Sequence, residues 1–338
     1  MSLSASVHYR CKSILKSQQQ IRHICHHSRG STYSPTLPVL SRLQTEIAIR
    51  DFHRTAARFR YDEHSRLSLS VSLLTGAHTN MICNIEKFRE QLAAGRFCLG
   101  AGITFSDPTV TEALTDSVDF FWIDLEHNPT SLESMTGHLL AARAGGTPAL
   151  VRVPSGEIAW IKRVLDAGAE GIILPQAQSA DDVRAFVSAC RYPPQGTRGF
   201  GPRRPSNYGR RGGRDYLEHA NRHLFVVAQI ETVSALNQID EIVEIPGLDS
   251  LVVGPYDLSG SMGMLGEVHH ADVKAAITTV VGKARAAGLY VGMGMGADRG
   301  HALEAAQLGV NWAQCGNDYE YMIRTVDGLF AEVRKELA

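Results

Sequence analysis

The feature that most constrains this fold is a regular alternation of short apolar runs and amphipathic segments after residue 80. Near-continuous apolar strands are typical of a parallel sheet that helices cover on both faces. Eight strand–helix units in a chain of this length predict a (β/α)8 TIM barrel, and a doubly wound open sheet is the alternative. The expected strands are residues 97–104, 120–127, 148–154, 171–177, 224–231, 250–254, 289–295 and 312–315.

Helix start signals support this division of the chain. Asp107-Pro108 is typical of an N-cap with proline at the first helical position, and Ser179 opens a second capped segment. A loop rich in Gly, Arg and Pro covers residues 192–213 and precedes a short helix that ends near Arg222. The other expected helices are residues 131–144, 158–167, 179–190, 233–243, 271–287, 298–308 and 319–337.

Residues 1–80 differ from the rest in composition and are expected to form an N-terminal extension. They hold eleven basic and four acidic residues and seven of the 14 histidines, without a sustained hydrophobic period. One interpretation is a dispensable or non-native extension with translation starting at Met81, and another is a disordered tail. A basic, Ser-rich, acid-poor start is also the composition of an organelle transit peptide. The barrel domain is predicted to span residues 81–338.

Charge and composition exclude several classes of protein. The 34 basic and 35 acidic residues give a net charge of −1, so we expect no nucleic-acid partner. No apolar run reaches the roughly 18 residues that a membrane span requires, so we expect no membrane partner. None of the six cysteines forms a C-x-x-C pair, and a disulfide framework is not expected in a chain this long. These features predict a cytoplasmic protein, with organelle targeting by the basic extension as the alternative.

Polar side chains at the ends of the fifth and sixth apolar runs form the first candidate site. Active sites of TIM barrels lie at the carboxyl ends of the strands. Gln229 and Glu231 are two residues apart, so on a strand they point to the same side, into the barrel mouth. With Asp257 from the next strand, Glu231 would ligate a hard divalent cation such as Mg²⁺ or Mn²⁺. The alternative is a buried carboxylate paired with a nearby arginine.

Charged residues at the ends of the second and third runs form the other half of the candidate site. Asp124 and His127 are three apart at a strand end, where a carboxylate would fix the histidine tautomer for a general base; Glu126 is the next candidate base. Arg152 offers a planar fork for a substrate carboxylate. The alternatives are a histidine that satisfies its local turn and an arginine in a structural ion pair with Asp124 or Glu126.

Two further motifs allow more than one interpretation. Residues 292–297 (GMGMGA) superficially fit the dinucleotide fingerprint, although glycines that admit a neighbouring group explain them as well. The loop 198–204 carries three arginines and would either cover the site and bind an acidic substrate or remain solvated. No lysine ends any of the expected strands, which disfavours a Schiff-base aldolase.

Six segments of the chain together resemble the HpcH/HpaI family of metal-dependent class II pyruvate aldolases. The resemblance covers about residues 85–330, with the motifs in order and at suitable spacing. It implies a barrel of the phosphoenolpyruvate/pyruvate-binding type. It also implies reversible cleavage of a 4-hydroxy-2-oxo acid to pyruvate and an aldehyde, through a metal-stabilised enolate. The motifs are WIDLEHNP (122–129), LVRVP (150–154), GAEGIILPQ (168–176), GTRGFG (196–201), QIET (229–232) and GPYDLSGSMG (254–263).

The resemblance implies roles for residues of the metal half of the site. Glu231 and Asp257 are similar to the family's metal ligands, which would hold Mg²⁺, Mn²⁺ or Co²⁺. Gln229 is similar to the glutamine beside the bound pyruvate. Ser259, in the last motif, is expected to contact substrate.

The resemblance implies catalytic roles as well. Arg152 is similar to the arginine that holds the pyruvate oxygens and steadies the enolate, and His127, oriented by Asp124, is similar to the base that acts through water. The family's assembly implies a homo-oligomer, a hexamer built from dimers that exchange their last helix. Residues 319–337 are long enough for that role.

Two positions depart from the family pattern, which commonly has a small residue in place of Leu125 and alanine in place of Tyr256. Tyr256 adds bulk beside a metal ligand, so the aldehyde partner is expected to be unusual. The alternatives to an aldolase are a citrate-lyase-like acyl-CoA lyase of the same superfamily and a non-catalytic barrel that binds 2-oxo acids.

Overall fold

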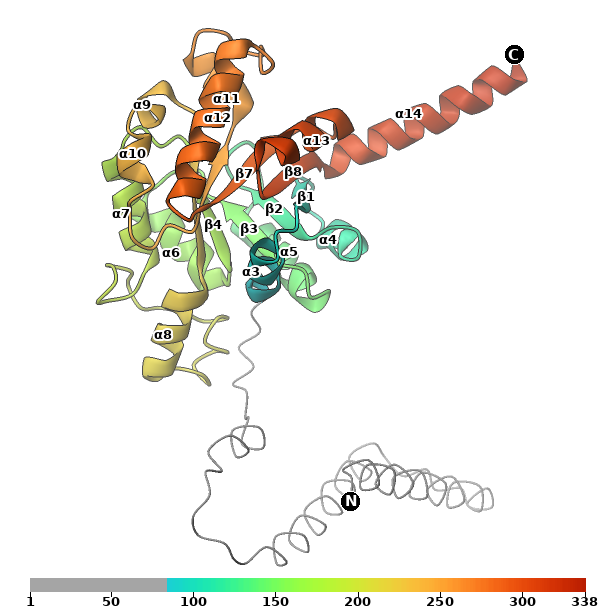
Figure 1. The fold of residues 1–338 in the computed structure, drawn as a ribbon. Helices are drawn as coiled ribbons and strands as arrows, with labels where there is room; N and C mark the ends of the chain where they lie inside the picture. Colours follow the sequence, from blue (N-terminus) through green and yellow to red (C-terminus); the bar gives the residue numbers. More distant parts are fainter. Residues whose placement is uncertain (1–83) are drawn as a thin grey trace, which may run out of the picture. The chain divides into compact units, whose positions relative to one another are not determined.

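Residues 84–338, the part of the chain that the computed structural model describes, form a closed barrel of eight parallel strands (Figure 1). Each strand pairs with its neighbours in chain order, and the last closes the barrel against the first. The (β/α)8 barrel expected from the sequence is confirmed. The strands are β1 (Cys98–Ile103), β2 (Phe120–Asp124), β3 (Ala149–Arg152), β4 (Gly171–Leu174), β5 (Phe225–Ile230), β6 (Ser250–Val253), β7 (Tyr290–Met295) and β8 (Trp312–Asn317).

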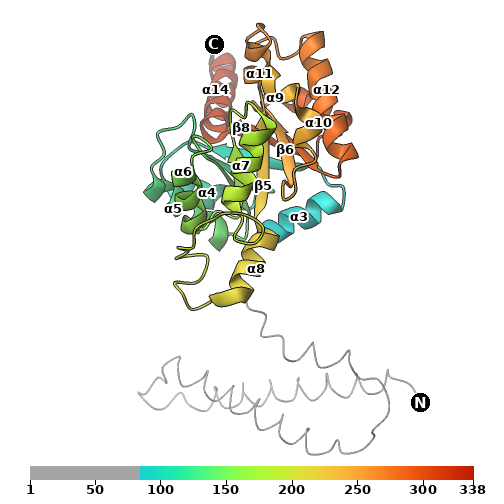
Figure 2. The same cartoon turned by 90° about the vertical axis from the view of Figure 1, so that its left-hand side faces the viewer.

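Helices cover the outside of the barrel and alternate with the strands along the chain (Figures 1 and 2). The first described helix precedes β1. The helices are α3 (Ile85–Ala93), α4 (Pro108–Leu114), α5 (Leu132–Ala144), α6 (Ile158–Ala167), α7 (Ala180–Cys190), α8 (Gly213–His223), α9 (Val233–Leu236), α10 (Ile239–Ile242), α11 (Pro255–Ser261), α12 (Ala271–Ala286), α13 (Arg299–Leu308) and α14 (Asp318–Leu337).

The two helix caps predicted from the sequence form in the structure. Asp107 accepts a hydrogen bond from the Thr109 amide at 2.9 Å, with Pro108 in the first turn of α4. Ser179 and Asp182 form a capping box at the start of α7. These caps satisfy amide groups that have no partner inside the helix, and so they fix where each helix begins after its strand.

Two layers of apolar side chains hold the barrel together. One layer lies between the sheet and the surrounding helices, and the other fills the barrel interior together with the inner face of α3. The ring of Phe88 in α3 lies 5.1 Å from that of Phe120 and 5.4 Å from that of Phe225, centre to centre. Because α3 closes the amino end of the barrel, the open mouth lies at the carboxyl ends of the strands.

The glycine segment that fits the dinucleotide fingerprint lies largely within β7. A Cβ added to Gly292 would lie 2.2 Å from the ring of Trp312 on the neighbouring strand. The indole N–H of Trp312 donates to Ser250 at 3.0 Å, which fixes the ring in that position. Close approach of Trp312 therefore explains Gly292 without a bound nucleotide.

Several elements differ from the expected ones, among them β2 and β4, which end at Asp124 and Leu174, each three residues before the expected end. The expected helix 233–243 is divided into α9 and α10, and the side chain of Gln238 between them accepts a hydrogen bond from the Ala180 amide at 3.1 Å. The residues after 254, expected at the end of the sixth strand, form helix α11 instead, because Gly254 and Pro255 begin a helical turn there. Strand β8 extends to Asn317 rather than to residue 315.

The predictions for residues 1–80, including the domain boundary and a start at Met81, concern residues outside the described part of the chain and stay predictions. Within residues 84–338, no helix combines the length and the apolarity that crossing a membrane would need.

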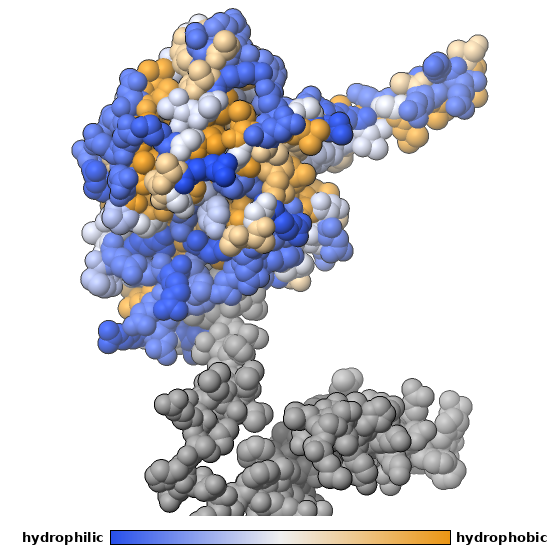
Figure 3. All heavy atoms as spheres, in the orientation of Figure 1, coloured by the Kyte–Doolittle hydropathy of each residue, from blue (hydrophilic) through white to orange (hydrophobic). Residues whose placement is uncertain are grey.

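The last helix, α14, projects from the barrel and carries an apolar stripe. Figure 3 shows hydrophobic side chains along this projecting helix. Its large hydrophobic residues recur at helical spacing and are all more than two-fifths exposed. They are Tyr319, Met322, Ile323, Val326, Leu329, Phe330, Val333 and Leu337.

Candidate active site

The carboxyl ends of the strands open into a cavity of about 620 Å³, which we call the mouth cavity. This is the end at which TIM barrels carry their active sites. Five of the candidate residues line it, and Glu231, only 1% exposed, lies buried against one of them, Gln229. The charged and amide side chains of the lining are Asp124, His127, Asn128, Arg152, Gln229, Asp257, Gln314, Asn317, Glu320 and Arg324.

Two carboxylates hold Arg152 at the end of β3. Its Nε and Nη2 donate to the two carboxylate oxygens of Asp124 at 2.8 and 2.7 Å, and its Nη1 lies 2.9 Å from Oε2 of Glu126. The guanidinium carbon also lies 5.3 Å from the centre of the Trp122 ring. Burial alone would lower the pKa of Arg152, but the hydrogen-bonded Asp124 and the nearby Glu126 raise it. The side chain is therefore a charged fork that is already in place.

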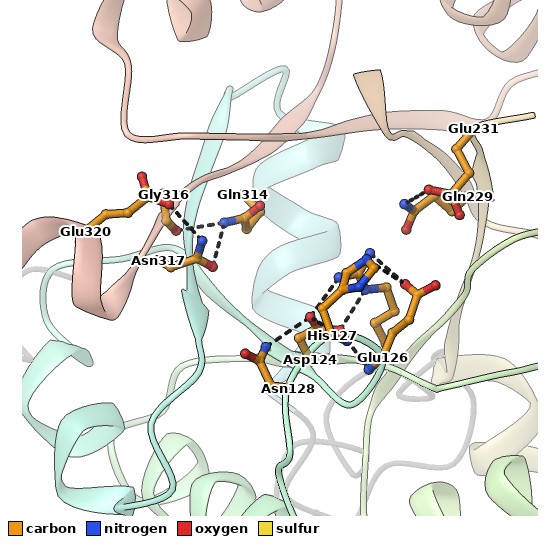
Figure 4. Close-up of polar contacts among 11 residues, drawn as sticks. Asp124, Glu126, His127, Asn128, Gln229, Glu231, Gln314, Gly316, Asn317 and Glu320 are labelled. Atoms are coloured by element: carbon orange, nitrogen blue, oxygen red, sulfur yellow. Dashed lines mark hydrogen bonds and ion pairs between the residues drawn. The ribbon is translucent and has the colours of Figure 1, made fainter. Parts of the chain in front are cut away.

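His127 lies at the rim of the mouth cavity, and its contacts differ from the expected ones (Figure 4). Asp124 accepts from the His127 backbone amide at 3.3 Å and from the Asn128 side chain at 3.0 Å, and not from the imidazole ring. Asp124 does not orient the ring as expected, because Arg152 occupies both of its carboxylate oxygens. The ring nitrogen Nε2 faces Oε2 of Glu126 instead, at 3.6 Å.

Glu126 has the environment of a proton-transfer group. Burial raises its pKa to about 7, and the negative charges of Asp124 and Asp257 add to this shift although Arg152 opposes it. A carboxyl group that titrates near neutrality is suited to take up and return a proton. Glu126 and the exposed ring of His127 are therefore the candidates for proton transfer beside this cavity.

Gln229 and Glu231 point to the same side of the barrel, as predicted from their spacing on β5. The side-chain amide of Gln229 donates to Oε2 of Glu231. The other carboxylate oxygen of Glu231, Oε1, accepts from the backbone amide of Gln176 at 2.6 Å. Gln176 takes a left-handed backbone conformation, with a φ of 53°. Burial raises the pKa of Glu231 to about 7. No arginine, lysine or histidine of residues 84–338 forms an ion pair with this carboxylate.

The oxygens around Glu231 fit a hard divalent cation. Asp257 lines the same cavity from the first turn of α11, and not from a strand end as expected. Oε1 of Gln229 is buried without a hydrogen-bond partner among the described residues. Gly254 lets both side chains approach the backbone closely, since a Cβ there would lie 2.8 Å from Gln229 and from Glu231. Two carboxylates and the Gln229 amide oxygen suit Mg²⁺ or Mn²⁺, which keep several water or substrate ligands.

The metal ligands in such a site would come mainly from water and substrate. Within residues 84–338, no three His, Cys, Asp or Glu residues are grouped closely enough to hold a metal ion by themselves. The expected ligand pair Glu231 and Asp257 stays a prediction, and catalytic Mg²⁺ sites often use only one or two protein carboxylates.

Ser259 does not lie with the other candidates. It is fully buried, and its hydroxyl donates to the Tyr256 carbonyl at 2.6 Å and accepts from the Gly266 amide at 3.1 Å. The helical turn of α11 directs this side chain into the loop that follows the helix. Ser259 therefore stabilises the position of α11, which carries Asp257.

The arginine loop 198–204 does not cover the mouth cavity. It lies between α7 and α8, and both Arg198 and Arg204 line a different cavity, at the amino ends of the strands. Of the two interpretations of this loop, the one in which it covers the site and binds substrate there is wrong, because the segments between a helix and the next strand return to the amino end of the barrel.

A chain of polar side chains on the opposite wall was missed by the sequence analysis (Figure 4). Gln314 donates to the Gly316 carbonyl at 2.8 Å and to Asn317 at 3.3 Å. Asn317 donates in turn to Glu320 at 2.8 Å, and Glu320 accepts from the Ala297 amide at 3.0 Å. The sequence pattern that could have revealed them is a polar residue at every third position from 314 to 320. This stretch spans the end of β8 and the start of α14.

Known proteins resemble this chain over the barrel. The family model described as HpcH/HpaI aldolase/citrate lyase matches residues 104–325. A hydroxypyruvate/pyruvate aldolase from Roseovarius nubinhibens is 34% identical over 252 residues, which are 74% of this chain and 97% of that protein. A 4-hydroxy-2-oxo-heptane-1,7-dioate aldolase from Salmonella dublin is 34% identical over 252 residues, 74% of this chain and 95% of that one. The crystal structure of an HpcH/HpaI aldolase/citrate lyase family protein from Burkholderia cenocepacia superimposes with a TM-score of 0.69 at 31% identity, covering 73% of this chain and 98% of the other.

Proposed function

This chain belongs to the HpcH/HpaI aldolase/citrate lyase family, and from that premise we propose that it is a metal-dependent carbon–carbon lyase, a class II pyruvate aldolase. The proposed reaction is the reversible cleavage of a 4-hydroxy-2-oxo acid to pyruvate and an aldehyde. The observation that carries the proposal is one cavity that joins a fixed guanidinium, Arg152, to the Asp257 carboxylate and to Gln229, against which Glu231 is buried. A 2-oxo acid presents a carboxylate and a keto oxygen, which these two features would bind together.

Arg152 binds and orients the substrate in this mechanism. A guanidinium has five N–H donors, and the hydrogen bonds to Asp124 use two of them, while Glu126 forms an ion pair with Nη1. Three donors remain for the oxygens of the 2-oxo acid, and the positive charge of the guanidinium stabilises the enolate as it develops. A divalent cation held by Glu231 and Asp257 would supply Lewis-acid polarisation of the keto group.

His127 and Glu126 move the proton. Cleavage requires that the C4 hydroxyl lose a proton, and the pyruvate enolate must then gain one at its methyl carbon. We assign the first step to His127, acting directly or through one water from the rim of the cavity. Glu126 faces the same ring at 3.6 Å and stabilises its protonated form. In the addition direction the same groups return the proton to the new hydroxyl.

A product assay tests this function and separates it from the alternatives. The full-length protein with added Mg²⁺ or Mn²⁺ is incubated with a 4-hydroxy-2-oxo acid and, separately, with citryl-CoA. The expected result is equal amounts of pyruvate and aldehyde from the first substrate and no cleavage of the second. Cleavage of citryl-CoA alone, to oxaloacetate and acetyl-CoA, would establish the acyl-CoA lyase. Binding of the 2-oxo acid without any turnover would establish the non-catalytic barrel.

We also propose that the protein is a homo-oligomer in which α14 is exchanged between subunits. The apolar stripe of α14 has no cover within residues 84–338, and an isolated amphipathic helix is marginal in water. Light scattering of the wild type should give a dimer or a larger assembly. Phe330→Glu should weaken that assembly, whereas Glu332→Ala on the same exposed helix should not. A monomeric wild type at micromolar concentration would contradict helix exchange.

A further inference from the structure

A second cavity, which we call the basal cavity, lies at the other end of the barrel from the mouth cavity. Its volume is about 320 Å³, and it is lined by Thr147, Glu170 and Leu224, which precede β3, β4 and β5. Strands of a parallel barrel all begin at one end, so the basal cavity is at the end opposite to the active site. Helix α8 contributes to its wall, and Figures 1 and 2 both show α8 and α11 at opposite ends of the barrel.

The polar lining of the basal cavity is cationic. Arg143, Arg204 and Arg211 line it, and none of the three takes part in the ion pairs that arginines form within residues 84–338. Arg204 donates to the Ala167 carbonyl at 2.6 Å, and its pKa is lowered by burial and by the nearby Arg143. Three guanidinium groups therefore share this space without carboxylate partners.

The one carboxyl group in the described lining does not neutralise these arginines. Glu170 accepts a hydrogen bond from the backbone amide of Ile85 at 2.9 Å and so stabilises the first residue of α3. Burial raises the pKa of Glu170 to about 7, which reduces its negative charge near neutral pH. The basal cavity thus carries net positive charge.

Two almost fully buried polar groups in the lining have no hydrogen-bond partner among the described residues. Tyr216 is 3% exposed and the side chain of Arg198 is 4% exposed. The hydroxyl of Tyr216 and the Nε of Arg198 are both unpaired. Buried polar groups in folded proteins are normally satisfied, and a ligand is one of the groups that can satisfy them.

Apolar side chains form much of the remaining wall. They are Leu139, Ala142, Leu165, Ala169 and Leu224. The volume lies at the lower end of the range for small-molecule pockets, which combine an apolar wall with a few convergent polar groups. Such a cavity suits a compound with a short carbon body and an anionic group.

We propose that the basal cavity binds a small organic anion, a phosphate monoester or a carboxylate, through Arg143, Arg204 and Arg211. The anionic oxygens accept from the guanidinium groups, and the Tyr216 hydroxyl supplies a neutral donor.

Titration calorimetry on the full-length protein tests this site. The protein is first treated with EDTA, so that the proposed metal site does not bind the probes, which are glycerol 3-phosphate and glutarate. At least one probe should bind the wild type and Arg210→Gln equally, since Arg210 is exposed and outside the cavity. Arg143→Gln and Arg211→Gln should each bind about 10- to 100-fold more weakly, because each loses a charged donor. The preferred probe identifies the anionic group as phosphate or carboxylate.

Tyr216→Phe distinguishes a ligand-binding hydroxyl from a structural one. The Tm of the free variant should change little, because among the described residues the hydroxyl faces only that of Tyr192 and makes no well-formed hydrogen bond, while its affinity for the probe should fall. Equal affinity of the wild type, Arg143→Gln and Arg211→Gln would overturn the proposal, as would the failure of both probes to bind at millimolar concentration. Neither result bears on the aldolase, whose site is at the other end of the barrel.

Discussion

Substitution of Arg152 by lysine isolates the contribution of the guanidinium fork from that of its charge. In the structure, hydrogen bonds at 2.8 and 2.7 Å to Asp124, beside the ion pair with Glu126, leave three N–H donors for substrate. A lysine ammonium has three N–H donors, and the same two carboxylates would take at least two of them. The variant therefore loses at least one donor to the developing enolate oxygen. Loss of one such donor costs about 10²–10³-fold in kcat, or roughly 3–4 kcal/mol.

The assay is the exchange of pyruvate methyl protons with deuterated water, followed by NMR, because it reports enolate formation without an aldehyde. Arg152→Lys should exchange about 10²–10³-fold more slowly than the wild type. Arg163→Lys is the matched control, since Arg163 is exposed on α6 and lies outside the mouth cavity, and it should exchange at the wild-type rate. An Arg152→Lys enzyme that exchanges as fast as this control would refute the role given to the fork.

The remaining predictions concern the base, one buried carboxyl group and the extension. His127→Ala should lower the cleavage rate by about 10²–10⁴-fold with metal binding preserved. If this variant keeps wild-type rates of cleavage and of exchange, His127 is not the base and Glu126 is the next candidate. The pKa of Glu170, about 7, lies above its ordinary value, so its contribution to stability is complete below about pH 4.5 and is lost as the pH rises through 7. Glu126 and Glu231, whose pKa values are also raised to about 7, contribute to the loss of stability over the same range. In urea unfolding, Glu170→Gln should therefore reduce the loss between pH 4.5 and 7 by roughly 3 kcal/mol relative to the wild type; an unchanged loss would contradict the assignment. A chain that starts at Met81 should fold and keep its activity, and loss of either would show that residues 1–80 are integral.

The barrel was predictable because its signals are local. Each strand is a short apolar run, and caps such as Asp107 and Ser179 mark where the next helix begins. The paired orientation of Gln229 and Glu231 followed from strand geometry alone, since alternate residues of β5 share a face. These inferences needed no knowledge of distant contacts.

The parts that were not predictable depend on competition between groups far apart in the sequence. Asp124 was expected to orient His127, three residues away, but Arg152 from the next strand takes both of its oxygens. A guanidinium fork outcompetes a neutral ring for a buried carboxylate, and spacing along the chain does not reveal this. Asp257 was likewise placed at a strand end, whereas the turn at Gly254 carries it into α11.

The central claim is that Glu231 and Asp257 hold a divalent cation without which no enolate forms at the mouth cavity. The most direct test is pyruvate methyl exchange by the wild type before EDTA treatment, after it, and after Mg²⁺ or Mn²⁺ is restored. Glu231→Gln is measured alongside Glu241→Gln, an exposed glutamate of α10. The account predicts exchange that EDTA abolishes and metal restores, absent in Glu231→Gln and normal in Glu241→Gln. Undiminished exchange in the EDTA-treated wild type or in Glu231→Gln would contradict it.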